Sequence, residues 1–148
     1  MTKTFQRTKS QGFTLVEIMI VVAIIIVLAA IAIPNLVRSR LTANEAAAIA
    51  SLKTITWAAI TYRTSNSGYP ADIAQLGAGV PSYIDSVLST GTKQGYIFNV
   101  TGGSGNFNVT AQPVAENITG TRSFYSDASA VIRASTGSPA DGSSPPIE

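Results

Sequence analysis

A long apolar run near the amino terminus is the feature that most constrains this chain. Residues 18–33 contain no polar side chain, and flanking apolar residues within 13–37 extend the run to about 20 residues. A helix of this length is long enough to cross a lipid bilayer. Glu17 lies inside the run, where an uncompensated carboxylate costs roughly 2.5–3.5 kcal/mol. The run therefore predicts a membrane helix whose carboxylate has a partner or a function.

The residues before the run predict its orientation. Lys3, Arg7 and Lys9 precede it without any acidic residue, which favours a cytoplasmic amino terminus and export of the remainder. Arg38 and Arg40 weaken this signal but do not reverse it. An ordinary secretory signal peptide is the alternative interpretation. Such a peptide has an apolar core of about 7–15 residues followed by its cleavage site, whereas this run is longer and follows its glycine.

The run opens with Gly12-Phe13-Thr14-Leu15-Val16-Glu17 and closes with Ala32-Ile33-Pro34. With the short basic leader, this pattern resembles the class III prepilin signal of type IV pilins and type II secretion pseudopilins. In that family a membrane aspartyl protease cuts after the glycine, and the new amino-terminal residue is N-methylated. The resemblance implies that residues 1–12 are a cleaved leader peptide, that Gly12 and Phe13 form the processing site, and that Phe13 is methylated.

The resemblance also implies assembly roles for Phe13, Glu17 and Pro34. Cleavage frees an ammonium on Phe13, and the Glu17 carboxylate of an adjoining subunit would neutralise it where the dielectric is low, which would set the subunit register. Alternatively, Glu17 lies at the headgroup level of a plain anchor helix. Pro34 removes one backbone hydrogen bond and predicts a kink. Several pilus families have a glycine that helps the segment before this proline to lose helicity, but Ile26 stands there in this chain.

Composition limits what the exported part can do. The 148 residues allow one compact domain besides the apolar run. Three of the ten basic residues are in the leader, so the mature chain, with eight acidic residues, is near neutral and is not expected to bind nucleic acid directly. The absence of histidine removes the usual general base and metal ligand. We expect no enzymatic activity, no cofactor and no metal ion.

A continuous helix is predicted over residues 13–65, with an assembly half at 13–37. Residues 36–63 are rich in alanine and lack glycine and proline. About 53 residues correspond to ~80 Å of helix, which suits a filament better than a small globular domain. An apolar stripe at steps of three and four marks the face that packs on a sheet, with two further residues widening it: Ile49, Leu52, Ile55, Ala59 and Tyr62, with Trp57 and Ile60.

Residues 66–134 are expected to form a small head. Short helical turns are predicted over 72–77, with Asp72 as N-cap and Gly77 as the stop, and over 82–88. Alternating residues over 96–100 and 107–111, separated by glycines, predict one β-hairpin, and 122–133 predict a second. The expected fold class is therefore α+β, with a long hydrophobic amino-terminal helix packed on a small antiparallel sheet of four strands.

The end of the chain has a different composition. Residues 135–148 are mostly Ser, Gly, Pro and Ala, which predicts a flexible tail. The chain has no cysteine, so its carboxy-terminal region must close by packing or hydrogen bonds rather than by the disulfide loop that many pilins of the family carry.

Several local patterns support weaker hypotheses. The glycines of 102–105 lack the lysine and the following helix of a phosphate loop, and are better read as a hairpin turn. Three Asn-x-Thr sequences, beginning at residues 99, 108 and 117, fit the glycosylation pattern. Asp85, Asp127 and Asp141 are candidate calcium ligands, but they lack ligand spacing, and Asp127 is better read as a turn residue.

These observations favour a structural subunit of a type IV pilus, serving adhesion, motility or DNA uptake. A bacterial inner-membrane precursor with a cytoplasmic amino terminus would mature into an extracellular homo-oligomeric helical filament. The partners implied by the resemblance are a prepilin peptidase that is also the N-methyltransferase, an inner-membrane platform protein and an assembly ATPase. The alternatives are a major pseudopilin of a periplasmic type II secretion pseudopilus, and a monomeric membrane-tethered binding domain that needs no cleavage at Gly12.

Overall fold

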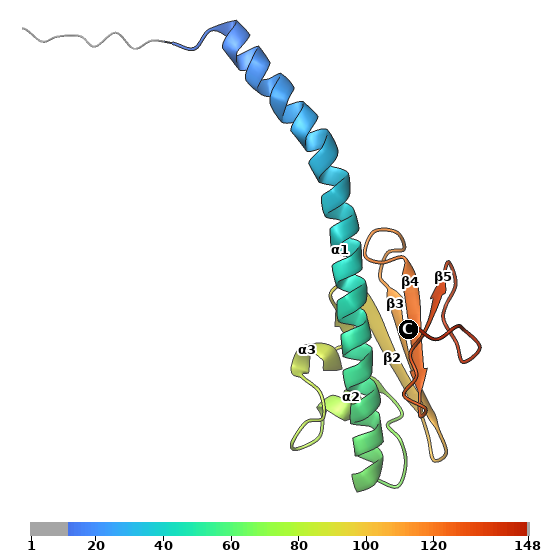
Figure 1. The fold of residues 1–148 in the computed structure, drawn as a ribbon. Helices are drawn as coiled ribbons and strands as arrows, with labels where there is room; N and C mark the ends of the chain where they lie inside the picture. The colour runs from blue at the N-terminus through green and yellow to red at the C-terminus, as the bar shows by residue number, and fades with distance from the viewer. Residues whose placement is uncertain (1–11, 148) are drawn as a thin grey trace, which may run out of the picture. The chain divides into compact units, whose positions relative to one another are not determined.

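A computed structural model of the chain describes residues 12–147, so most of the expected leader, including its three basic residues, lies outside the described residues. The longest element is helix α1, Leu15–Ser65, which continues through Pro34 (Figure 1). It begins two residues later than the sequence predicts and ends at the expected residue. The chain divides into two units, Met1–Val37 and Arg38–Glu148, and the boundary falls inside α1.

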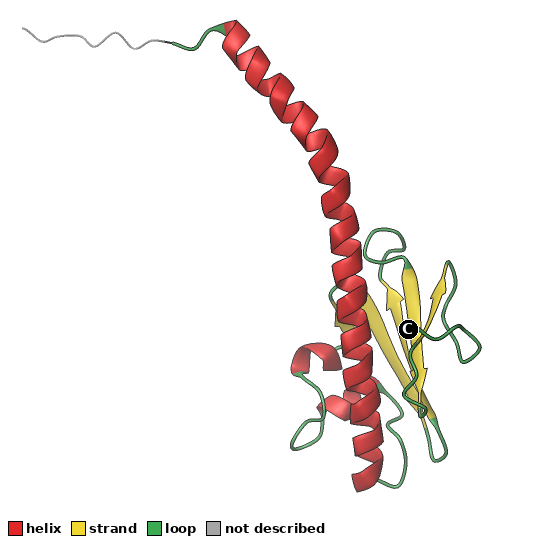
Figure 2. Ribbon diagram, in the orientation of Figure 1, coloured by secondary structure: helices red, strands yellow, loops and turns green. Residues whose placement is uncertain are grey.

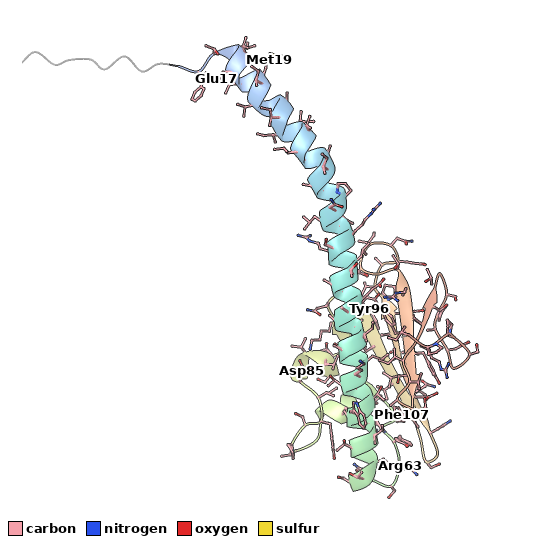
Figure 3. All side chains as sticks on the ribbon, in the orientation of Figure 1. Glu17, Met19, Arg63, Asp85, Tyr96 and Phe107 are labelled. Atoms are coloured by element: carbon pink, nitrogen blue, oxygen red, sulfur yellow. The ribbon has the colours of Figure 1, made fainter. Side chains whose placement is uncertain are left out.

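The described part of the first unit, residues 12–37, is exposed and is helical from Leu15 onward. From residue 12 to 37 every side chain is exposed except that of Ala29, which is half-buried. Side chains project from all sides of this part of α1 (Figure 3). Among residues 12–147, α1 is the helix long and apolar enough to cross a membrane. The kink expected at Pro34 stays a prediction.

In the second unit, called the head below, α1 packs against one face of the sheet (Figure 2). The predicted stripe supplies this contact: Leu52, Ile55 and Ala59 are completely buried, and Ile49 and Tyr62 pack at its margins. The prediction that Trp57 widens the stripe is wrong, because its side chain is 62% exposed. At about 100° per residue, Trp57 points some 200° away from both Ile55 and Ala59.

Within residues 12–147 the sheet is antiparallel and has five strands in the order β1-β2-β3-β4-β5. The bounds are Thr92–Lys93 for β1, Tyr96–Gly102 for β2, Phe107–Pro113 for β3, Arg122–Asp127 for β4 and Arg133–Thr136 for β5. The first predicted hairpin is confirmed, with Gly102 opposite Phe107. In the second, Tyr125 is opposite Arg133, and Asp127 accepts hydrogen bonds in the turn as expected.

The α+β class is confirmed, but the predicted strand count is wrong by one. Strand β1 pairs with β2 through a two-residue loop in which Gln94 and Gly95 both have positive φ, at 48° and 77°. Such a loop matches the right-handed twist of the strands. Glutamine rarely adopts this conformation, so this turn carries no recognisable hairpin signal.

Two short helices lie before the sheet. Helix α2, Ile73–Gly77, begins as predicted, since the Asp72 carboxylate accepts the Gln75 N–H at 2.9 Å. Helix α3, Ser86–Ser89, is shorter than the predicted 82–88, because the Asp85 side chain caps it by accepting the Leu88 N–H at 3.2 Å.

The predicted flexible tail is bound to the head instead. Strand β5 continues to Thr136, and Ala140 beyond it is buried. The segment 138–147, called the closing segment below, is hydrogen-bonded to the sheet and to the turn before β5. The carbonyls of Ser138, Ser144 and Pro145 accept bonds from Ser123 Oγ (2.6 Å), Arg133 Nη1 (3.0 Å) and the Ala134 N–H (3.0 Å), and the Ile147 N–H donates to the Ile132 carbonyl (2.9 Å). The composition of the tail does not indicate these bonds, because the segment makes most of them through its backbone carbonyls, which every residue has.

Candidate processing and assembly segment

The predicted cleavage junction is open. Gly12 and Phe13 precede the first turn of α1 and are not helical, and the Phe13 side chain is 77% exposed. Apart from the chain neighbours of Gly12, no heavy atom of the described residues lies within 4 Å of the position that a Cβ on Gly12 would take. Residues 12–14 are thus exposed and lie outside the helix, where a protease could reach the backbone.

Thr14 organises the start of α1. Its Oγ1 accepts the Glu17 backbone N–H at 3.2 Å, and its carbonyl accepts the Ile18 N–H at 3.3 Å. This is one half of a capping box, in which a threonine and a glutamate three residues later satisfy free N–H groups of the first turn. Thr14 is not among the residues predicted from the sequence, although the Thr-x-x-Glu spacing is a signal for it.

Glu17 is the acidic residue in the first turn of α1, at the end where the helix dipole favours a negative charge. The same dipole disfavours the ammonium that cleavage would create on Phe13, four residues earlier. A carboxylate in the first turn offsets that repulsion, whether the ammonium belongs to the same subunit or to a neighbour.

The structure brings some of the predicted site residues together and separates another. Gly12 and Phe13 lie just before α1, and Glu17 lies in its first turn (Figure 3, where Glu17 is labelled). Pro34 lies 17 residues beyond Glu17, or about 26 Å along the helix. Pro34 therefore has no part in the cleavage junction and acts, if at all, on the helix itself.

Comparison with known proteins identifies the segment. Residues 7–33 match the sequence family described as "Prokaryotic N-terminal methylation motif", and this range includes the Gly12–Phe13 junction, Thr14 and Glu17. The chain carries a prokaryotic N-terminal methylation motif. The match ends at Ile33, so it describes the exposed apolar unit and leaves the head outside.

Similar proteins are of two kinds. The chain is 40% identical to the type IV wide pilus major component PilA4 of Thermus thermophilus over 67 residues, which are 45% of this chain and 51% of that protein. It is 32% identical to the type II secretion system core protein G of Escherichia coli over 94 residues, 60% of this chain and 62% of that protein. It is 38% identical to the type IV major pilin protein PilA of Myxococcus xanthus over 69 residues, 47% of this chain and 31% of that protein.

The chain spans less than two thirds of the length of each of these relatives. The resemblance to type IV pilins and type II secretion pseudopilins is nevertheless confirmed at the level of sequence similarity, and both kinds of relative are represented.

The head contains a buried charge that sequence reasoning missed. Both Glu45 oxygens are bonded: Oε1 accepts the Thr121 N–H (2.9 Å) and hydroxyl (2.6 Å), and Oε2 pairs with Nη2 (2.8 Å) and Nε (2.9 Å) of Arg122. Nearby, Asn44 Nδ2 donates to the Thr119 carbonyl at 2.9 Å. These bonds, called the α1 clamp below, fasten α1 to the loop before β4 and to the first residue of β4.

In the α1 clamp the charges of Glu45 and Arg122 stabilise each other. Burial alone would raise the pKa of Glu45, but hydrogen bonds from Thr121 and the Arg122 charge outweigh it and leave the pKa below its usual 4.5. Burial, with the Glu45 charge nearby, raises the pKa of Tyr96 to about 12. The Tyr96 hydroxyl is therefore neutral and donates to the Arg122 carbonyl at 2.9 Å.

The three candidate calcium ligands have separate local roles. Asp85 caps α3 and pairs with Lys93 at 3.2 Å, whereas Asp127 accepts the Ser129 N–H. Asp141 accepts bonds from Ser143 and Ser144 in the closing segment. Across residues 12–147, no group of three Asp or Glu residues is arranged to hold a metal ion.

Proposed function

We propose that this chain is a structural, non-enzymatic subunit of a membrane-derived filament. The precursor is cleaved between Gly12 and Phe13, methylated at Phe13, and polymerised through residues 13–37. The observation that carries the proposal is the position of the methylation motif: it covers an open Gly12–Phe13 junction at the start of an exposed apolar helix.

Assembly would give the exposed apolar side chains a new environment. In a bilayer they contact lipid, and in a filament they contact the same segment of neighbouring subunits. Because lipid tails are as apolar as these side chains, packing and polar contacts must favour association. Pairing of Glu17 with the Phe13 ammonium of a neighbour would supply a polar contact and fix the register, with the curvature of the segment adjusted at Pro34.

The proposal implies a location and partners. The precursor spans the bacterial inner membrane with its amino terminus in the cytoplasm. A prepilin peptidase with N-methyltransferase activity processes it, and a platform protein and an assembly ATPase extract it. Direct contact with nucleic acid is not part of the proposal.

Two filaments remain as candidates because relatives of both kinds match. A surface type IV pilus is supported by similarity to pilins of Thermus and Myxococcus, and would serve adhesion, motility or DNA uptake. A periplasmic type II secretion pseudopilus is supported by similarity to core protein G, which has the longer aligned region. We favour the pilus and keep the pseudopilus as the second candidate.

The first test uses shearing and mass spectrometry. We expect filaments sheared from producing cells to contain a chain that begins at N-methylated Phe13. A processed chain that stays in the membrane and periplasm would favour the pseudopilus, and a chain that is never cut would refute the proposal. Gly12→Val should block processing, whereas Gly105→Ala, at a site with open space for a methyl group, should be processed normally.

A second test separates insertion from assembly. Glu17→Gln should leave membrane insertion and cleavage intact but reduce filament yield, because it removes the charge that pairs with the ammonium. The matched control is Glu116→Gln, which removes an exposed carboxylate from the head. A normal filament yield from Glu17→Gln would remove this account of the carboxylate.

A further inference from the structure

Two arginines follow the apolar segment directly. Arg38 and Arg40 are exposed on α1 and are the first charged residues after Glu17. Within residues 12–147 neither guanidinium belongs to an ion pair, because the ion pairs there involve other residues. Two cations without a carboxylate partner therefore mark the end of the apolar segment.

The spacing of the charges along α1 matches the thickness of a bilayer. Glu17 and Arg38 are 21 residues apart, which is about 32 Å of helix at 1.5 Å per residue. The hydrocarbon core of a bilayer is about 30 Å thick. When Glu17 lies at the inner headgroup layer, Arg38 therefore reaches the outer one.

The distance from the apolar segment to the first head contact fits a headgroup layer. Residues 38–43 precede Asn44 and Glu45, where the α1 clamp holds the helix. Six helical residues span about 9 Å, and each headgroup layer is roughly 5–8 Å thick. The arginines thus lie at the depth of the lipid phosphates, and the α1 clamp begins just beyond them.

The directions of the two side chains favour lipid over a protein partner. Residues two apart on a helix point about 200° away from each other, so Arg38 and Arg40 face opposite sides of α1. A protein docked on one side would meet one of them. Lipid headgroups surround a membrane helix and would meet both.

We propose that Arg38 and Arg40 form a collar that binds anionic phospholipid headgroups of the outer leaflet and holds the unassembled subunit at a fixed depth. The inference rests on the membrane-inserted precursor of the proposed function. Each guanidinium pairs with a lipid phosphate. Phosphatidylglycerol carries a net negative charge and is expected to bind, whereas phosphatidylcholine is zwitterionic and is not expected to bind. Extraction into a filament must break these pairs.

The test titrates the full, isotope-labelled chain in neutral-detergent micelles with short-chain phosphatidylglycerol, followed by NMR at the backbone amides of 38–43. We expect saturable shifts with phosphatidylglycerol and none with phosphatidylcholine. Arg38→Gln and Arg40→Gln should each weaken binding about fivefold at low ionic strength, and the double variant roughly 25-fold. Lys53→Gln, which removes an exposed charge 15 residues beyond Arg38, should change binding less than twofold.

Other outcomes would overturn the collar. Unchanged binding in the double variant would do so, as would equal shifts with water-soluble glycerophosphoglycerol, which would indicate a site for free phosphodiesters. Unchanged lipid binding with lost filaments would assign the arginines to a subunit contact. Any lipid binding by the basic residues of the leader is the same in every variant, so it does not affect the comparison between variants. A near-UV circular dichroism spectrum like that of the wild type shows that a variant's head is folded.

The collar and the proposed function fail in different ways. Cleaved, assembled wild-type chain without preference for phosphatidylglycerol would overturn the collar alone. A wild-type chain that is never cut would overturn the proposed function whatever its lipid preference.

Discussion

Removal of the Glu45 carboxylate should destabilise the head strongly. In Glu45→Ala the Thr121 N–H and hydroxyl lose their acceptor in a half-buried place, which costs about 1–2 kcal/mol for each donor left unsatisfied. The Arg122 side chain is 41% exposed and can be hydrated, so loss of the ion pair adds 1 kcal/mol at most, by the usual range for such pairs. Together these give about 3 kcal/mol, or roughly 10 °C in melting temperature for a unit of this size.

The assay is thermal unfolding of the full chain in neutral detergent, followed by near-UV circular dichroism of the packed tyrosines. Arg122→Gln should cost about 1 kcal/mol or less, because it leaves the bonds from Thr121 in place. Glu116→Ala, at an exposed carboxylate, should change stability by less than about 0.5 kcal/mol. If Glu45→Ala melts with the wild type, or if Arg122→Gln costs as much as Glu45→Ala, the reasoning is refuted.

The stabilisation from Glu45 should also depend on pH. Its pKa is lower in the folded head than the usual 4.5, so between the two values the unfolded chain binds more protons. The contribution is complete above pH 4.5 and is lost as the pH falls through the folded pKa. The difference between wild type and Glu45→Ala should therefore narrow in acid, and a constant difference would contradict the assignment.

Three further predictions concern the head. Tyr96 has its pKa raised to about 12, so its contribution to the stability of the head should be complete below pH 10 and fall toward pH 12. Tyr96→Phe should cost about 1 kcal/mol at neutral pH and remove this alkaline loss of stability; an alkaline melting curve like that of the wild type would contradict the prediction. Gly120→Ala should destabilise the head by about 1–3 kcal/mol, because the new Cβ would overlap the Tyr96 hydroxyl. Adding Tyr96→Phe should recover part of that stability, whereas purely additive effects of the two substitutions would argue against the overlap. Deletion of residues 138–148 removes the hydrogen bonds that the closing segment makes to the sheet and to the turn before β5, and should cost about 2–4 kcal/mol. A wild-type melting temperature would show that this segment is free in solution.

Local patterns predicted the elements that depend on local chemistry. The alternation of Tyr96 and Phe98, followed by glycines, was enough to place the first hairpin, and the structure adds its register. Asp72 before a short apolar turn was enough to predict the start of α2. The methylation motif could be recognised from the sequence because its residues are consecutive, within the matched range 7–33.

Long-range features escaped because no local pattern encodes them. Glu45 lies in an alanine-rich helix, where a carboxylate usually faces water, and its partners are 76 and 77 residues away. Trp57 was assigned to the core from its apolar character, although its angular position places it outside. The closing segment binds through backbone groups, and a sequence rich in Ser and Pro gives no sign of that.

The two edges of the sheet have a consequence for close packing of many heads. An open strand edge offers unpaired N–H and C=O groups to any neighbouring strand and invites aggregation. Here β1 has only two residues, and β5 is bridged at Arg133 by Pro146, a residue that has no N–H to offer. The heads can therefore be crowded together at high local concentration without joining strand to strand, which leaves the choice of neighbour to side chains and to the helix.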